Sequence, residues 1–143
     1  MTQLRLTANA VAEFLDEVFP GAMDHFVIEE LEPMRARVRM VFSEFRLRPG
    51  GTISGPSLMT LADTALWVAL LGMIGREPLS VTSHLDIDFL RKPAATDVVA
   101  HTTLHKIGRR LAVGDVLMYS GGESQPCARA SVTYAIPSVR NDP

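Results

Sequence analysis

The residue best suited to chemistry is Asp63, an acid within an apolar stretch. From Leu58 to Leu71 the only other residues that are not apolar are Thr60 and Thr64. A carboxylate in apolar surroundings must be hydrogen-bonded, face a cavity, or be held protonated. Such a group can serve as a general base or a nucleophile. It can equally be a structural residue that is bonded to a backbone group or an arginine.

A second candidate is the segment just before that stretch, where Ser54, Gly55 and Ser57 surround an expected helix start. Free N–H groups and the positive end of the helix dipole meet there. They would polarise a docked carbonyl oxygen as an oxyanion hole does, and Gly55 has no side chain to obstruct it. The alternative is a simple N-cap serine. Asp63 lies about 12 Å further along the helix axis, so another chain or a bent loop must close the gap.

The remaining polar candidates carry weaker signals. His101 and His105 would lie about 13 Å apart on a strand, so we expect no shared metal ion. Cys127 is the one cysteine, which excludes an internal disulfide and favours a packed side chain over a nucleophile. Arg109 and Arg110 stand at a tight turn, where they are either solvated charges or ligands for phosphate.

Hydrophobic spacing predicts the elements that position these residues. Apolar residues recur at helical spacing over 7–19 and 56–75, and the second segment is apolar around most of its circumference, which indicates a buried helix. Alternating patterns predict the strands. They fall in 26–42, broken near Glu32 and Pro33, and in 81–91, 97–107, 110–119 and 127–136.

The order of these elements predicts the fold class. One helix, two strands, a long buried helix and four strands indicate an α+β domain with an antiparallel sheet beside one central helix. Within 81–91, strict alternation places Val81 and Leu85 on one face and Thr82 and His84 on the other. No linker or repeat divides the chain, so we expect a single domain over 1–143.

Composition narrows the possible partners and location. The chain has 143 residues and a net charge of −2, from 14 basic and 16 acidic residues, so no charge excess indicates nucleic acid or an anionic membrane. The long apolar segment carries Asp63 and Gly72, which disfavours a membrane span. The first residues lack a long apolar run, so we expect no secretory signal and a cytoplasmic location.

Four stretches together resemble a known family. They are GTISGPSLMTLADTALWVAL, VTSHLDIDFLRKP, KIGRRLAVGDV and ARASVTYAIP, in that order within 50–137. This arrangement is similar to the hot-dog-fold acyl-CoA thioesterases of the phenylacetate-pathway (PaaI) type. The resemblance implies a curved antiparallel sheet wrapped around one long helix. It also implies a homodimer, or a dimer of dimers, with active sites at the subunit interface.

The resemblance implies a role for several residues. Asp63 matches the family aspartate, and Gly55 matches the glycine whose N–H polarises the thioester carbonyl. Thr82 matches a residue of the facing subunit that helps to place water. The turn at Gly108, Arg109 and Arg110 resembles the region that meets the nucleotide end of coenzyme A. For substrate contacts we also expect Ser54 beside the carbonyl, and an acyl pocket lined by Met59, Leu66 and Trp67.

The chain also departs from the family pattern. Members usually have His-Gly-Gly where this chain has Ser54-Gly55-Pro56, and an asparagine that precedes this motif has no counterpart around Arg48. The leading hypothesis is hydrolysis of an acyl-CoA thioester without a metal or redox cofactor, coenzyme A being part of the substrate. The alternative is a non-catalytic acyl-CoA-binding sensor or carrier, which Ser54 and Pro56 favour. Hydratase chemistry is a third option, for which we find no suitable His–Asp/Glu pair.

Overall fold

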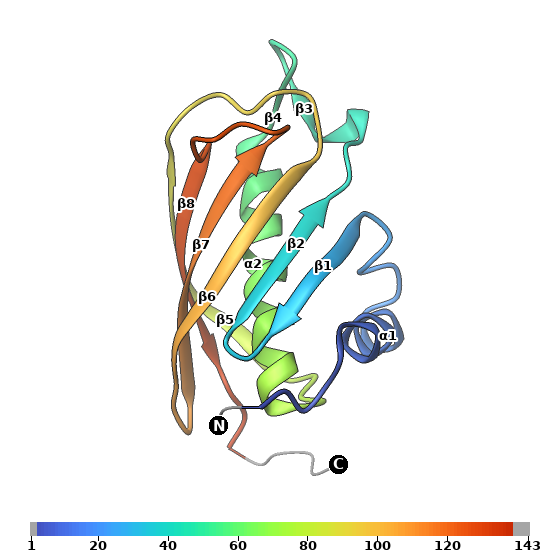
Figure 1. Ribbon diagram of the computed structural model, residues 1–143, viewed down its shortest axis with the longest axis vertical. Coiled ribbons are helices and arrows are strands. Elements are labelled where there is room, and N and C mark those ends of the chain that lie inside the picture. Colours follow the sequence, from blue (N-terminus) through green and yellow to red (C-terminus); the bar gives the residue numbers. More distant parts are fainter. Residues whose placement is uncertain (1–2, 139–143) are drawn as a thin grey trace.

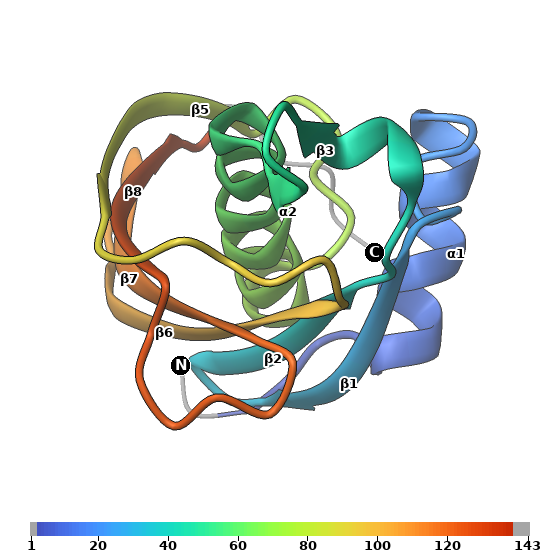
Figure 2. The same ribbon diagram turned by 90° about the horizontal axis from the view of Figure 1, so that it is seen from above.

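A long helix inside a curved sheet forms the centre of the protein. The computed structural model describes residues 3–138. Helix α2 (Gly55–Ile74) lies in the concave side of a six-stranded antiparallel sheet, and Figure 2 shows the sheet curving around it. The predicted α+β class and the hot-dog arrangement are confirmed.

The sheet brings strands from both halves of the chain together (Figure 1). Its strands, in spatial order, are β1 (Phe26–Glu32), β2 (Arg35–Met40), β6 (Val98–Ile107), β7 (Leu111–Ser120), β8 (Ala128–Ala135) and β5 (Val81–Phe89). Strands β1 and β5 are therefore the two edges. Strand β5 pairs only with β8, although β6 and β7 lie between the two in sequence. Their pairing places the start of β5 beside the end of β8.

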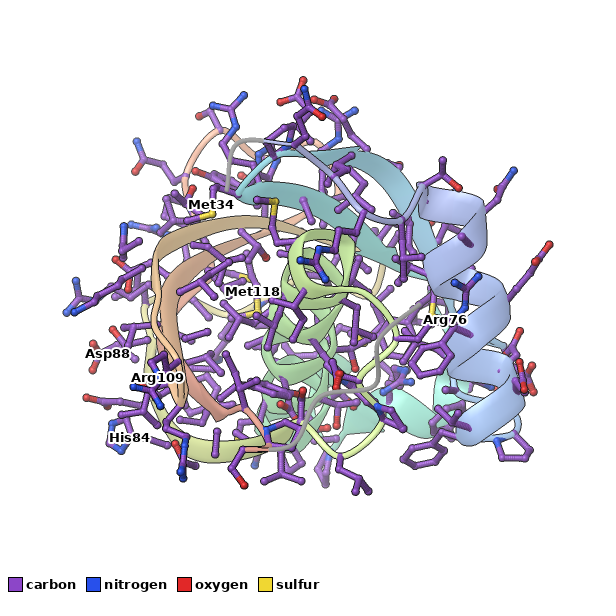
Figure 3. All side chains as sticks on the ribbon, turned by 90° about the horizontal axis from the view of Figure 1, so that it is seen from below. Met34, Arg76, His84, Asp88, Arg109 and Met118 are labelled. Carbon is purple, nitrogen blue, oxygen red and sulfur yellow. The ribbon has the colours of Figure 1, made fainter. Side chains whose placement is uncertain are left out.

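The core lies between α2 and the sheet. Strands β6, β7 and β8 alternate buried and exposed residues, with the buried ones toward the helix. Figure 3 shows Met118 pointing from the sheet toward α2, whereas His84 and Asp88 point away from it. Although α2 is long and apolar enough to cross a membrane, 72% of its most apolar window is buried in the protein. It therefore has the burial of a core helix.

The remaining elements are a second helix, α1, and a set of short pieces that precede α2. Helix α1 (Ala8–Val18) is capped by Thr7 and packs beside β1 and α2. Between β2 and α2 lie a 3-10 turn, η1 (Glu44–Arg46), and a hairpin of β3 (Leu47–Arg48) and β4 (Thr52–Ile53). These pieces are too short to leave a periodic pattern in the sequence. Helix α2 starts at Gly55, one residue before the expected start.

The predicted faces of β5 were wrong at Thr82. The pairing of β5 with β8 shifts register between Thr82 and His84, which leaves Ser83 as an extra residue. Thr82 pairs with Tyr134, whose side chain is buried on the concave face. A bulge of this kind reverses the alternation on one side of it. Thr82 therefore points toward α2, on the same face as Leu85, and not outward with His84.

Candidate active site

Helix α2 leaves one narrow stripe uncovered by the sheet. After its first turn, every residue of the helix that is not buried lies on this stripe. Its members, spaced as on one helical face, are Met59, Thr60, Asp63, Thr64 and Trp67. The predicted acid is therefore half-buried at the rim of the core, and not sealed inside it.

Two hydroxyl groups hold one oxygen of the Asp63 carboxylate. The Thr82 hydroxyl donates to Asp63 Oδ1 at 2.6 Å, and the Tyr134 hydroxyl donates to the same atom at 2.7 Å. Within residues 3–138, no donor lies on Oδ2. Asp63 is thus hydrogen-bonded, which is one of the three states expected for a carboxylate in apolar surroundings. Its second oxygen, Oδ2, stays open.

The contact with Thr82 lies within a single chain. The resemblance implied that Thr82 acts from the facing subunit, but its hydroxyl reaches Asp63 of its own chain. The bulge at Ser83 makes this possible because it turns Thr82 toward the helix. Asp63 and Thr82 therefore belong to the same half of any site that two chains share.

Ser54 caps the start of α2, which is the N-cap alternative stated for this serine. Ser54 Oγ accepts the Ser57 N–H at 3.3 Å and so caps the helix, and Pro56 follows Gly55 in the first turn. No acceptor among the described residues takes the N–H of Gly55. The helix end therefore offers an open backbone donor together with the positive end of its dipole.

A buried arginine fixes the segment that leads to this helix end. The Arg46 carbonyl accepts the Ser54 N–H at 2.8 Å. Its guanidinium carbon lies 5.5 Å from the ring centre of Phe26 and 4.8 Å from that of Phe45. Burial lowers the pKa of the Arg46 guanidinium below its ordinary value. The cation–π contacts anchor the loop, and Ser54 is thereby held at the cap position.

A basic groove of about 720 Å³ opens beside Gly55. Phe89, at the end of β5, covers the glycine closely: a Cβ at Gly55 would lie 3.3 Å from the ring. The groove also carries three cationic side chains, those of Arg48, Arg91 and Lys92. Arg91 is held in place because it donates to the Pro126 carbonyl. Anionic groups of a ligand would be attracted to this groove.

The residues expected to line an acyl pocket do not all lie on open surface. Met59 and Trp67 lie on the uncovered stripe, and the Trp67 ring stacks on Tyr134 with 6.3 Å between ring centres. Leu66 has no exposed surface and packs in the core, where it faces Gly114 of β7. Leu66 therefore packs between α2 and the sheet, out of reach of a ligand on the stripe.

The turn at Gly108, Arg109 and Arg110 lies far from Gly55 of the same chain. It joins β6 to β7 at the end of the molecule opposite to β3, β4 and the start of α2 (Figure 1). One protomer thus does not bring the basic turn and the helix end together. Any contact of this turn with a ligand bound at Gly55 would have to come from a second protomer.

A second hollow, of about 330 Å³, lies on the convex face of the sheet. There His105 Nε2 and Asp115 Oδ2 are 2.9 Å apart, and the Ser131 hydroxyl donates to Asp115 Oδ1 at 3.1 Å. These contacts lower the pKa of Asp115, the largest effect coming from His105. A catalytic triad needs the hydroxyl on the histidine, whereas here both bind the acid. The cluster therefore does not activate Ser131 as a nucleophile.

The other weak candidates keep structural roles. Cys127 is buried, and burial raises the pKa of its thiol, which fits a packed side chain. His101 packs edge-on against Tyr119. In residues 3–138, no group of three His, Cys, Asp or Glu side chains is placed to hold a metal ion.

Tyr134 and Phe89 are residues of the candidate site that sequence patterns did not predict. Tyr134 lies 71 residues from Asp63, and no short motif connects them. A signal was nevertheless present: the other inward residues of β8 are the small or aliphatic Ala128, Ala130 and Val132, so a tyrosine in that series needs a partner for its hydroxyl. Phe89 gave no signal, because a strand-end phenylalanine is also typical of a core.

Comparison with known proteins shows that this chain is similar to thioesterases. The family described as the Thioesterase superfamily matches residues 50–127 of the chain. A proposed thioesterase of Silicibacter sp. TM1040 is 41% identical to this chain, with a TM-score of 0.88 and 95% of each chain covered.

More distant structures share the fold. A variant of the phenylacetic acid degradation protein PaaI from Thermus thermophilus is 23% identical, with a TM-score of 0.68, covering 87% of this chain and 99% of that one. A hypothetical thioesterase protein from Streptococcus pneumoniae, whose structure includes coenzyme A, is 20% identical, with a TM-score of 0.77 over 92% of this chain and 100% of that one.

Proposed function

The chain belongs to the thioesterase superfamily, and from this membership we propose that it hydrolyses an acyl-CoA thioester to a free acid and coenzyme A. The observation that carries the proposal is the Asp63 carboxylate, which two hydroxyl donors orient through one oxygen while the other stays open. An oriented carboxylate with a free oxygen suits a general base or a nucleophile.

The proposed reaction uses both oxygens of Asp63. Oδ1 is occupied by Thr82 and Tyr134, so Oδ2 is the atom that acts. It takes a proton from a water molecule as the water oxygen attacks the thioester carbon, or it attacks that carbon itself and water hydrolyses the resulting anhydride. On either route the carbon–sulfur bond breaks, and the thiolate of coenzyme A leaves and takes up a proton.

The oxyanion is stabilised at the start of α2. Gly55 N–H is an open donor at the positive end of the helix dipole, which is where a developing negative charge on oxygen is favoured. Gly55 and Asp63 of one chain are separated by about 12 Å along the axis. We therefore assign Gly55 of one protomer and Asp63 of its partner to the same site, in a homodimer.

The basic groove supports coenzyme A as the leaving group. Coenzyme A carries several phosphates at its nucleotide end, and the groove beside Gly55 presents Arg48, Arg91 and Lys92. The solved coenzyme A complex of the Streptococcus pneumoniae protein, which shares the fold, is consistent with this choice of substrate. The turn at Arg109 and Arg110, supplied by the partner, is the second candidate for these contacts.

The test is thiol release from a panel of short-chain, long-chain and aryl CoA thioesters, with binding measured in parallel. We expect hydrolysis of at least one class, with saturation kinetics. Binding of the panel without thiol release would contradict the enzymatic proposal and establish the acyl-CoA sensor or carrier in its place.

A further inference from the structure

Tyr134 is a buried residue that points at the proposed catalytic carboxylate. Its side chain is 2% exposed, and its hydroxyl lies 2.7 Å from Asp63 Oδ1 and 3.3 Å from the Asp63 carbonyl oxygen. The rest of the inner face of β8 is aliphatic. A buried hydroxyl in such surroundings needs a hydrogen-bond partner, and Asp63 supplies it.

The position of Tyr134 is fixed from two sides. Across the sheet it pairs in register with Thr82, the other donor to Asp63 Oδ1. Its ring also stacks on Trp67, one helical turn beyond Asp63, with an angle of 24° between the ring planes. The two donors and the carboxylate therefore form one rigid unit that joins α2, β5 and β8.

From this geometry, and on the basis of the proposed function, we propose that Tyr134 is a positioning residue for hydrolysis. Together with Thr82 it holds Asp63 Oδ1, and so it aims Oδ2 at the water or the thioester carbon. Two donors on one oxygen fix the rotation of the carboxylate, which a single donor would leave freer. Tyr134 acts through Asp63 and does not itself touch the reacting atoms.

The state of the phenol supports this role. Burial first, and then the negative charge of Asp63, raise the pKa of Tyr134 far above its ordinary value of 10. The hydroxyl therefore keeps its proton at neutral and moderately alkaline pH, and it remains a donor throughout that range. For the same reason Tyr134 does not serve as the base.

The test compares the same chemical change at the two tyrosines of the chain. Tyr134→Phe removes the donor and keeps the ring, whereas Tyr119→Phe makes the same change on β7, where the ring packs against His101. We expect Tyr134→Phe to lower kcat by roughly 10- to 100-fold with KM within about twofold. Tyr119→Phe should match the parent protein. Because a smaller folded fraction would also lower the apparent kcat at unchanged KM, each rate is expressed per folded enzyme, with the folded fraction taken from circular dichroism and thermal unfolding.

A second comparison asks whether Tyr134 acts through Asp63. Added to Asp63→Asn, the change Tyr134→Phe should leave the residual rate unaltered, since its target is already lost. A further loss of roughly tenfold or more in the double variant would overturn the positioning role. If Tyr134→Phe does not fold, Tyr134→Leu, which also lacks the donor, replaces it in both comparisons.

The outcomes separate this inference from the proposed function. If Asp63→Asn is inactive but Tyr134→Phe keeps the parent kcat, the positioning role is wrong and the thioesterase proposal stands. If the parent protein hydrolyses no thioester in the panel, the proposed function is wrong, and the role of Tyr134 in hydrolysis fails with it.

Discussion

Asp63 differs from Asp88 and Asp97 in the charge of its partners. Asp88 pairs with Arg129, and Asp97 pairs with Arg39. Asp63 instead accepts hydrogen bonds from two neutral hydroxyls. An arginine would neutralise the carboxylate, whereas neutral donors orient it and leave its negative charge in place. This is the arrangement that a base or nucleophile requires.

The substitution Asp63→Asn tests that interpretation. The amide has nearly the same size, so the helix should pack as before, and Tm should stay the same or rise. We expect kcat to fall by roughly 10²–10⁴ because the positioned base is lost. The measurement is thiol release with the best substrate, together with thermal unfolding.

The matched control for this substitution is Asp88→Asn, on the outer face of β5. Asp88 is exposed and its partner is the exposed Arg129, so its removal should leave kcat and Tm close to those of the parent. A folded Asp63→Asn protein with the parent rate would refute the catalytic role. An unfolded one would make Asp63 a structural residue.

A second prediction at this scale concerns the nucleotide end of the substrate. Replacing Arg48 and Lys92 with alanine should raise KM by about 3- to 10-fold, roughly 0.7 to 1.4 kcal/mol, with little change in kcat. Phosphate contacts remote from the thioester act alike in the ground state and the transition state. The measurement is steady-state kinetics at low ionic strength, where such contacts are strongest.

The comparison variant replaces Arg109 and Arg110 with alanine. The family resemblance implies that this turn meets the nucleotide end, and the structure places the turn at the far end of the protomer from Gly55. A rise in KM in this variant alone would assign the phosphates to the turn of the partner and remove the groove from the binding site.

At the residue scale, local patterns predicted part of the site. Asp63 stood out because acids are rare in a buried helix, and Gly55 because a capped helix follows it. Tyr134 could not be found this way, since its contact with Asp63 depends on the pairing of β5 with β8. Thr82 was assigned to the wrong face because a bulge leaves no mark in an alternating pattern.

Bulges decide which side chains of two strands face inward. One lies between Thr82 and His84 in β5, and another lies between Leu104 and Lys106, where β6 pairs with β7. The long strands and both helices followed from periodicity, which many residues determine together. A bulge depends on one residue and its cross-strand neighbours, so sequence spacing alone did not reveal either one.

Gly114 gives a prediction at the scale of these elements. It pairs with Leu104 beside the second bulge, and a Cβ there would lie 2.6 Å from both Leu66 Cδ1 and the Thr103 carbonyl oxygen. Gly114→Ala should therefore destabilise the protein by about 1–3 kcal/mol, measured by denaturant unfolding. Its control is Val113→Ala, whose side chain is partly exposed on the opposite face. Equal stability of the two variants would mean that the space beside Gly114 accommodates a methyl group.

On the scale of the whole molecule, one side of the protomer is left open. Strand β5 is an edge of the sheet and pairs on one side only. Apolar side chains lie exposed on it, with Val81 57% and Phe89 54% exposed, and Leu79, two residues before the strand, is 73% exposed. The other edge, β1, lies beside α1 (Figure 2). Uncovered edges that carry apolar residues are prone to pair with another chain.

This open side supports the predicted homodimer. Thr82 lies on β5, so pairing through this edge brings a second chain close to the stripe of α2 that carries Asp63. A two-fold axis would then give two equal sites. Assembly as a dimer or a tetramer, a cytoplasmic location and the lack of a resident cofactor stay predictions.

The most direct test of the shared site is complementation between two inactive variants. Asp63→Asn removes the acid, and Gly55→Val adds a branched side chain next to the carbonyl-binding N–H, where a Cβ would lie 3.3 Å from the Phe89 ring. Each variant alone should be nearly inactive. Co-expressed with two different affinity tags and purified through both, they form mixed dimers in which one site combines Gly55 of one chain with Asp63 of the other. We predict that these mixed dimers recover about half of the parent rate per dimer, because one of the two sites is intact. Mixed dimers no more active than either variant alone would contradict a site built from two chains.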